Sequence, residues 1–204
     1  MPAPSMPAPI SIRPAGPADA ATAAFLLHEA AGGIPLAMWE AAAEPSRNPW
    51  AIGAARMEER MARATVRMLD APDPATGAPA PAAFLMGYPI PAPEPVPADA
   101  PEPFVPLLEL EALSAPSWYI NALAALPGAR GRGHGARLLA TAEAEARAAG
   151  LDALSLIASD ANAGAIRLYE RTGFAVVASR PQRPVASWTP KGRDWLLMVR
   201  RGLG

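Results

Sequence analysis

Hydrophobic positions in the first third of the chain follow a helical period after one short alternating segment. Ile10 to Arg13 alternates between apolar and polar residues, which predicts a strand that Pro14 ends. Apolar residues then recur every three or four positions, and glycine or proline interrupts the pattern between segments. This spacing predicts three helices, over residues 17–31, 34–44 and 50–63.

The middle of the chain predicts a hairpin followed by a proline-rich insert. Residues 64–69 and 82–88 have the composition of strands, and the aspartates, prolines and glycine between them are typical of a turn. Residues 89–106 are rich in proline, and their only charged residues are acids, Glu94, Asp99 and Glu102. This composition predicts an extended polyproline-like loop. The loop either covers a substrate entrance and attracts a cation or is a passive insert, and the sequence leaves both open.

The second half of the chain alternates strands with helices. Leucines three positions apart favour a short helix over residues 104–113, with a strand as the alternative. Strands are predicted over 118–126, 154–157, 174–179 and 195–200, and helices over 135–149 and from Asn162, a helix cap, to Gly173. The pattern predicts an α/β fold, in the wider sense that includes α+β, with a mixed twisted sheet of about seven strands. Residues 10–204 would form one domain after a flexible leader over residues 1–9.

A glycine-rich loop between a predicted strand and a predicted helix indicates anion binding. Gly131, Gly133 and Gly135 allow the backbone to turn, so that successive N–H groups and the helix N-terminus converge on a phosphate. Arg130 and Arg132 add positive charge and planar hydrogen-bond donors. The alternative is a glycine-rich turn whose arginines are only solvated.

Two common nucleotide loops fit this segment poorly. No GK[ST] sequence ends it, which excludes a Walker-type loop. Gly131, Gly133 and Ala136 satisfy the dinucleotide pattern G-x-G-x-x-G/A, but the first acid at a strand end is Asp160, which comes too late. Only 69 residues follow Gly135, too few for the remaining strands of such a domain.

Composition limits the classes of function further. The 204 residues include 18 basic and 19 acidic side chains, so no overall field favours nucleic acid or an anionic membrane. There is no cysteine, which excludes disulfides and cysteine-ligated metals, and His28 and His134 are far apart, which argues against any metal site. The N-terminus lacks the pattern of a signal peptide, and prolines interrupt the apolar residues 112–129. We therefore expect a cytoplasmic protein with no membrane and no nucleic-acid partner.

Two motifs resemble those of the GNAT family of N-acetyltransferases. Arg130-x-x-Gly133-x-Gly135, after an apolar strand and Pro127, is similar to the family's acetyl-CoA loop, Q/R-x-x-G-x-G/A. The segment from Asn162 to Phe174 is similar to its later motif, N-x-x-A-x-x-L-Y-E-x-x-G-F. The resemblance is specific over residues 118–174. It implies a central pair of parallel strands that splay apart to admit acetyl-CoA.

The resemblance also implies roles for particular residues. Backbone N–H groups in the loop would bind the pyrophosphate of acetyl-CoA, and backbone groups of Leu123 and Ala125 would pair with its pantetheine arm. Tyr169 would protonate the leaving thiolate. The cofactor-binding candidates are Leu123, Ala125, Arg130, Gly131, Arg132, Gly133, His134, Gly135 and Asn162.

The general base is the point at which the chain departs from the family. Many relatives carry an acid on the central strand, where this chain has Asn121, which cannot act as a base. Glu109 and Glu111 are the nearest acids in sequence, and burial among leucines would raise their pKa values toward a useful range. The alternative is that both lie on a solvated or salt-bridged helix face.

These observations predict transfer of an acetyl group from acetyl-CoA to a small-molecule or peptide amine, without a metal. Because the central strand has no acid, a non-catalytic acyl-CoA-binding module is a second hypothesis. A nicotinamide-dependent oxidoreductase is the third and weakest. The sequence leaves the oligomeric state open, a homodimer included.

Overall fold

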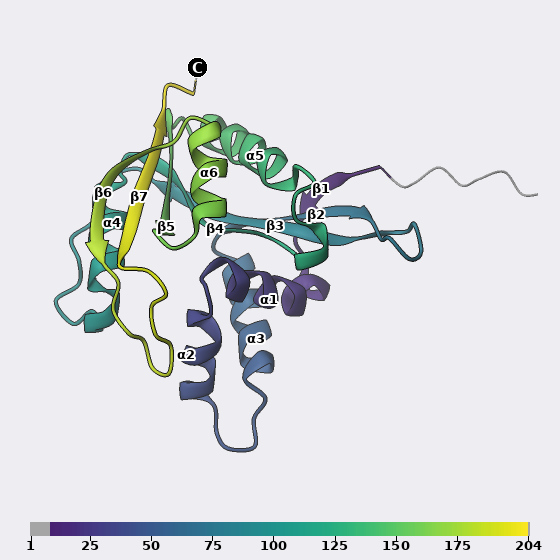
Figure 1. Cartoon of the computed structure of the whole chain (residues 1–204), viewed down its shortest axis with the longest axis horizontal. Coiled ribbons are helices and arrows are strands. Elements are labelled where there is room, and N and C mark those ends of the chain that lie inside the picture. The colour runs from purple at the N-terminus through teal and green to yellow at the C-terminus, as the bar shows by residue number, and fades with distance from the viewer. Residues whose placement is uncertain (1–8, 204) are drawn as a thin grey trace, which may run out of the picture.

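The computed structural model describes residues 9–203, which form a seven-stranded mixed sheet with helices on both faces (Figure 1). The strands are β1 (Ser11–Pro14), β2 (Thr65–Pro72), β3 (Pro79–Ile90), β4 (Ser117–Ala125), β5 (Ala153–Ser159), β6 (Ala175–Pro181) and β7 (Asp194–Arg201). The α-helices are α1 (Ala20–Ala30), α2 (Ile34–Ala42), α3 (Pro49–Met61), α4 (Val105–Leu113), α5 (His134–Ala148) and α6 (Ala163–Arg171). Short 3-10 turns are η1 (Pro17–Asp19), η2 (Glu102–Phe104) and η3 (Pro127–Ala129). The predicted leader lies outside the described residues, except for Pro9.

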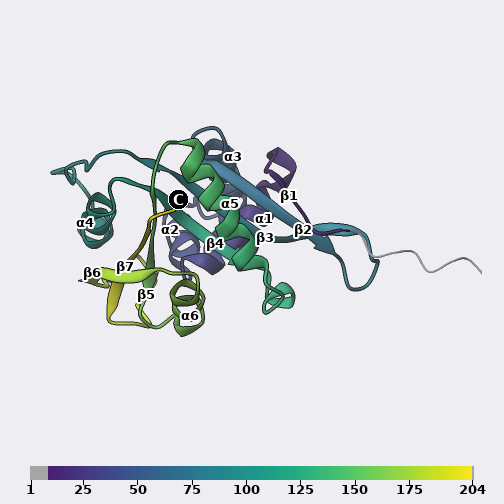
Figure 2. The ribbon, with the colours of Figure 1, turned by 90° about the horizontal axis from the view of Figure 1, so that it is seen from above.

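The strand order is β1-β2-β3-β4-β5-β7-β6. Within residues 9–203, β4 and β5 are the only parallel neighbours, and the other pairs are antiparallel. The parallel pair requires a crossover connection, which α5 supplies by lying over β3 and β4 (Figure 2). The predicted mixed sheet of about seven strands is confirmed.

One face of the sheet is covered by the three N-terminal helices. In Figure 1, α1, α2 and α3 lie below β3 and β4, and their buried side chains form one apolar cluster with Met68, Phe84 and Met86 of the sheet. Trp39 of α2 lies against Gly53 of α3 so closely that a Cβ at Gly53 would come within 2.6 Å of the Trp39 ring. A glycine is therefore needed where these two helices pack.

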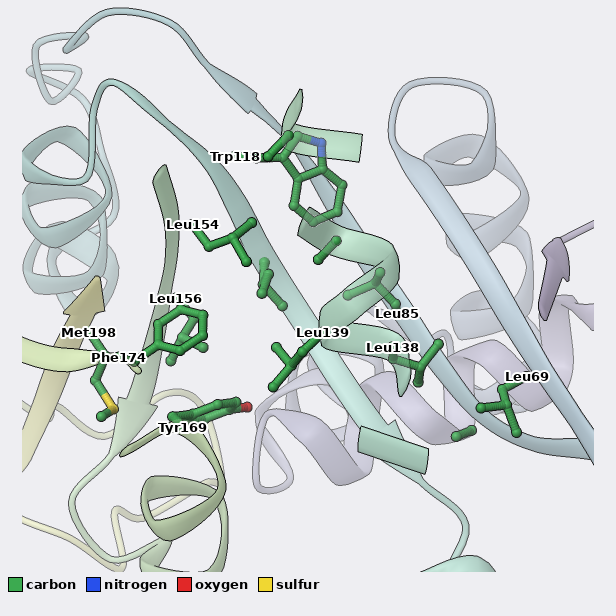
Figure 3. Close-up of a cluster of buried hydrophobic side chains, with 14 of the residues drawn as sticks. Leu69, Leu85, Trp118, Leu138, Leu139, Leu154, Leu156, Tyr169, Phe174 and Met198 are labelled. Carbon is green, nitrogen blue, oxygen red and sulfur yellow. The ribbon is translucent and has the colours of Figure 1, made fainter. Parts of the chain in front are cut away.

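The opposite face is covered by α5 and α6. Leu138 and Leu139 of α5, both fully buried, pack against Leu85 of β3 and Leu154 of β5 in a second cluster (Figure 3). The alanines on the same side of α5 allow the helix to approach the sheet closely. The hydrophobic period that predicted this helix therefore identified its buried face.

A third cluster lies under α4, at the other end of the sheet. Leu110 is fully buried there against Leu197 and Trp195 of β7. The prediction of a helix rather than a strand is confirmed, but the three-residue leucine repeat was a poor guide to its face. Because α-helices turn every 3.6 residues, Leu113 rotates away from the core and is 53% exposed.

The connection between β6 and β7 extends across the sheet toward the N-terminal helices. Trp188 stacks on Trp195 of β7, with ring centroids 6.2 Å apart, and its indole N–H donates to the Gly32 carbonyl at 2.8 Å. This contact joins the loop to the turn between α1 and α2.

Among residues 9–203, no single helix is long and apolar enough to cross a membrane. The helical stretches Pro17–Ala30 and Ile34–Ala42 reach that length and composition only when taken together, and they are bent by 119°.

Candidate active site

The parallel strands at the centre of the sheet separate after a short paired region. Their pairing covers only Trp118–Ile120 of β4 and Leu154–Leu156 of β5. At the paired end, the buried hydroxyls of Ser117 and Ser155 are hydrogen-bonded at 2.6 Å. Beyond Ile120 and Leu156 the two strands no longer pair with each other, which opens the sheet toward the C-terminal end of β4.

A β-bulge lies on β4 where this opening begins. Met86 pairs with Ala122 and Gly87 pairs with Ile120, so that Asn121 is the extra residue without a partner on β3. Bulges bend a strand and increase its local twist. The bulge therefore explains why β4 turns away from β5 at this position.

The glycine-rich loop follows β4 and leads directly into α5. Gly131 and Gly133 have φ values of +75° and +79°, which residues with a Cβ rarely adopt, and Gly133 is the residue before the first turn of α5. The N–H groups of a first helical turn have no partner within the helix. The predicted strand, loop and helix start are confirmed, and the helix begins with donors suited to an anion.

The arginines of this region divide into two kinds. The Arg130 guanidinium forms an ion pair with Glu29 of α1 at 2.5 Å and donates to the Ala125 carbonyl at 3.3 Å. Arg132 and Arg137 make no ion pair with any residue from 9 to 203. Free positive charge therefore lies at Arg132, which was predicted, and at Arg137, which was not. Arg137 could have been identified from the sequence, because it is a basic residue one turn into the helix that follows the glycine loop.

His134 contributes to the loop through its backbone. Its side chain is 3% exposed, and neither ring nitrogen has a hydrogen-bond partner. Burial lowers its pKa, and the nearby charges of Arg132 and Arg137 lower it further, so that the ring is neutral. Its N–H at the start of α5 remains the group placed toward an anion.

The first turn of α5 lies against both α6 and the separated part of β4. A Cβ at Gly135 would come within 2.7 Å of the Leu168 side chain and 3.7 Å of the Leu123 side chain. Asn162 caps α6, because its side-chain oxygen accepts a hydrogen bond from the Ala165 N–H at 3.1 Å. The two motifs, about thirty residues apart in the sequence, therefore meet beside the open strand.

Tyr169 lies in the core next to this opening. It is 7% exposed, and its ring is 5.7 Å from that of Phe174. Figure 3 shows its hydroxyl directed from α6 toward Leu139 and β4. Burial raises the pKa of this hydroxyl to about 12, so that it keeps its proton at neutral pH.

A cluster of polar side chains lies on the face of the sheet opposite Tyr169, where β4 and β5 begin to separate. The Tyr88 hydroxyl donates to Glu111 Oε1 at 2.9 Å, and the Tyr88 ring is 5.5 Å from that of Tyr119 on β4. Burial raises the pKa of Tyr88, the charge of Glu111 and its hydrogen bond with Tyr88 raise it further, and the nearby Asn121 side chain lowers it slightly. Tyr88 thus connects Glu111 on α4 to the bulge residue of the separated strand.

The two predicted base candidates lie in different surroundings. Burial raises the pKa of Glu111; the hydrogen bond from Tyr88 opposes this effect, and the charge of Glu94 adds to it. Glu109 instead forms an ion pair with Arg180 of β6. Glu111 therefore lies beside Tyr88 in the structure, and Glu109 does not. Tyr88 and Tyr119 belong to no local motif, and only the strand pairing places them together.

A cavity of about 390 Å³ adjoins Glu111 beneath the proline-rich insert. Its walls are formed by the end of β3, the insert and α4. The lining residues are Tyr88, Pro89, Ile90, Pro91, Ala92, Glu94, Pro95, Val96, Pro97, Leu108, Glu111 and Ala112. In the part of the chain that the structure describes, no group of three or more His, Asp and Glu side chains is arranged to hold a metal ion.

Comparison with known proteins is consistent with this geometry. The model of the acetyltransferase (GNAT) family matches residues 37–174. Comparison with curated protein sequences finds no match.

Solved structures with a similar fold include several acetyltransferases. The structure of yncA from Salmonella typhimurium with its cofactor acetyl-CoA has a TM-score of 0.58 at 18% identity, covering 95% of this chain and 94% of that one. A GNAT family acetyltransferase from Elizabethkingia anophelis with acetyl-CoA bound has a TM-score of 0.53 at 15% identity, over 94% and 97% of the two chains. The ribosomal-protein-S18-alanine N-acetyltransferase from Escherichia coli has a TM-score of 0.54 at 21% identity, over 94% and 93%. At these identities the likeness concerns the fold.

Proposed function

Because this chain belongs to the acetyltransferase (GNAT) family, we propose that it transfers the acetyl group of acetyl-CoA to the nitrogen of an amine. The position of Glu111 is the observation that favours an amine as the acetyl acceptor. It is a carboxylate of raised pKa at the edge of a cavity, linked through Tyr88 to the point where the central strands separate. An alkyl ammonium must lose a proton before it can attack a thioester, and this group is placed to accept one.

The cofactor side of the site fits acetyl-CoA. The stretch of β4 after Ile120, which includes Leu123 and Ala125, pairs with β3 but not with β5, so its open edge offers backbone groups to an extended pantetheine arm. The loop N–H groups before and within the first turn of α5 face the pyrophosphate, and Arg132 and Arg137 supply the positive charge. Arg130 holds the loop to α1 and the end of β4, which fixes these donors in place.

The base in this mechanism is Glu111. The amine nitrogen gives its proton to the Glu111 carboxylate, directly or through one water molecule, and then attacks the thioester carbonyl carbon. The Tyr88 hydroxyl holds the carboxylate in place through its 2.9 Å hydrogen bond. Glu111 thus takes the role that the central-strand acid has in many relatives, where this chain has Asn121.

The negative charge formed during attack is met by groups on β4 and α6. A backbone N–H of β4 at the bulge, where Asn121 has no partner on β3, donates to the carbonyl oxygen. The carbon–sulfur bond then breaks, the nitrogen loses its second proton to solvent to give the amide, and the leaving thiolate accepts a hydrogen bond from the Tyr169 hydroxyl. Full proton transfer from a phenol of pKa about 12 to a thiolate whose acid has a pKa near ~8.5 is uphill, at about 1.4 kcal/mol per unit. Stabilisation of the thiolate by hydrogen bonding is therefore the main contribution of Tyr169.

Calorimetric titration with acetyl-CoA, run beside NADH, followed by a thiol-release assay with a panel of amines, tests the proposal. We expect acetyl-CoA to bind at micromolar concentration, NADH to give no heat, and at least one amine to release CoA. Binding of acetyl-CoA with no turnover of any amine would favour a non-catalytic acyl-CoA-binding module. Binding of NADH alone would favour the oxidoreductase hypothesis.

A further inference from the structure

The cavity beneath the proline-rich insert contains acids that form no ion pair with any described residue. Two carboxylates line it, Glu94 from the insert and Glu111 from α4. Neither forms an ion pair with any described residue, whereas neighbouring acids do: Glu109 pairs with Arg180, and Glu102 pairs with Arg183 at 3.1 Å. The cavity therefore carries two carboxylates whose charge no described residue balances through an ion pair.

The charges of Glu94 and Glu111 act on each other. The negative charge of Glu94 contributes to the raised pKa of Glu111, which shows that the two carboxylates are close enough to interact. Among residues 9–203, no basic residue lines the cavity. Arg60, at the end of α3, is near enough to lower the pKa of the Tyr88 hydroxyl but lies outside the lining. The arrangement leaves two negative charges that a ligand would have to balance.

The remaining walls are apolar, and the volume suits a small molecule. Prolines of the insert, with Ile90 and Leu108, form these walls. A cavity of about 390 Å³ is within the range of ligand pockets, and at about 30 Å³ per water-sized group it holds roughly a dozen non-hydrogen atoms. A ligand that fills it would combine an aliphatic chain with positive charge.

On the basis of the proposed function, we infer that the acceptor is a small aliphatic diamine or polyamine held in this cavity. One amine reacts beside Glu111, where Tyr88 leads to the separated strands. A second, protonated amine lies near Glu94, and the methylene chain between them contacts the prolines. A carboxylate in place of the second amine would be repelled, so free amino acids are poor acceptors.

Matched amines with and without the second charge test this inference. The thiol-release assay would compare 1-aminobutane, 1,4-diaminobutane and 4-aminobutanoic acid, and then diamines of three to six carbons. We expect kcat/KM for the diamine to exceed that for the monoamine by about fivefold, the upper end of the range for one exposed ion pair. A diamine has two equivalent amines, which alone would double kcat/KM, and the expected preference exceeds this statistical factor. The amino acid should be the poorest of the three.

Substitution of Glu94 tests whether this carboxylate causes the preference for the diamine over the monoamine. Glu94→Gln should reduce the preference for the diamine to about the statistical twofold value and leave the KM for acetyl-CoA unchanged. Asp99→Asn is the matched control, because Asp99 belongs to the same insert but does not line the cavity. It should keep the preference. Raising the salt concentration should weaken the preference in the wild type and have no effect in Glu94→Gln.

A binding measurement separates failure of this inference from failure of the proposed function. The same amines would be titrated into the protein saturated with CoA, with and without Glu94→Gln. Equal use of monoamine and diamine, unaffected by Glu94→Gln, would overturn the inference and leave amine acetylation intact. If no amine were acetylated, diamine binding that depends on Glu94 would still support the cavity assignment, and its absence would overturn it.

Discussion

The two faces of the opening between β4 and β5 are built in different ways. The side that we propose for acetyl-CoA consists of a glycine loop, the first turn of α5 and one capped helix, and it depends mainly on backbone groups. The side that we propose for the acceptor consists of side chains from β3, β4, α4 and the insert, with Glu111, Tyr88 and Asn121 at its centre. Backbone donors recognise any acyl-CoA, because they read the pyrophosphate and pantetheine alone. Choice of acceptor therefore depends on the side-chain face.

The largest expected effect is loss of the base on the acceptor face. Glu111→Gln keeps the shape but cannot accept a proton, so kcat/KM for an alkyl amine should fall by roughly 10²- to 10⁴-fold with unchanged affinity for acetyl-CoA. Glu109→Gln is the matched control on the same helix, and it should change kcat/KM little because Glu109 pairs with Arg180. Equal losses in the two variants would show that α4 contributes only structure.

The pH profile tests the same residue independently of the size of the loss. A base must be unprotonated, so wild-type kcat/KM should fall as pH decreases through the raised pKa of Glu111. The pH at which kcat/KM falls to half should lie above the ordinary glutamate pKa of about 4.3. This fall should be missing from the Glu111→Gln profile.

The next largest effect is expected on the opposite side of the sheet, at Tyr169. Tyr169→Phe removes only the hydroxyl, and a hydrogen bond to a charged group is commonly worth about 1.5–3 kcal/mol. We expect kcat to fall about 10- to 100-fold while the Kd for acetyl-CoA, measured by calorimetry, stays the same. An unchanged kcat would remove Tyr169 from the mechanism and leave it as a core residue beside Phe174.

A smaller effect on affinity is expected from the glycine loop. Gly133→Ala places a Cβ at φ +79°, which costs about 1–2 kcal/mol and disturbs the N–H groups before α5, so we expect about tenfold weaker binding of acetyl-CoA. Gly150→Ala is a matched control at the other end of α5, with φ +70° and equally open surroundings. Thermal unfolding should show similar destabilisation of both variants, whereas only Gly133→Ala should weaken binding. If both variants bound acetyl-CoA like the wild type, the loop would not be the anion site.

The smallest effect is expected from Tyr88→Phe. The hydrogen bond from Tyr88 lowers the pKa of Glu111, so its loss should raise that pKa further. The lower limb of the kcat/KM profile should then move to higher pH, with a loss of activity on the acidic side of the profile and nearly full activity at higher pH. A shift to lower pH would contradict the described hydrogen bond, and no shift would show that Glu111 is not the titrating base.

The same contrast appears in what could be predicted from the sequence. The seven strands, the helix of Tyr169 and the glycine loop follow from hydrophobic period, helix caps and turn residues, all of which act over a few residues. Glu111 could be named as a candidate only because it is near Asn121 in sequence, and Glu109 had an equal claim. Tyr88 was not predicted as a functional residue, because no local pattern marks it. Arg137 follows a local signal that was not used, and Glu94 was named only as one of the acids of the insert.

The sequence by itself determined the elements, the loop conformation and the family, because glycine, proline and apolar spacing constrain the backbone locally. Tertiary structure alone decided where β4 and β5 separate, since that depends on a bulge at Asn121 relative to the partner strand β3. It also separated Glu111 from Glu109, because residues two apart on a helix point in nearly opposite directions, one toward Tyr88 and the other toward Arg180. The face that we propose for the acceptor is made by contacts between distant segments, and such contacts exist only in the folded chain.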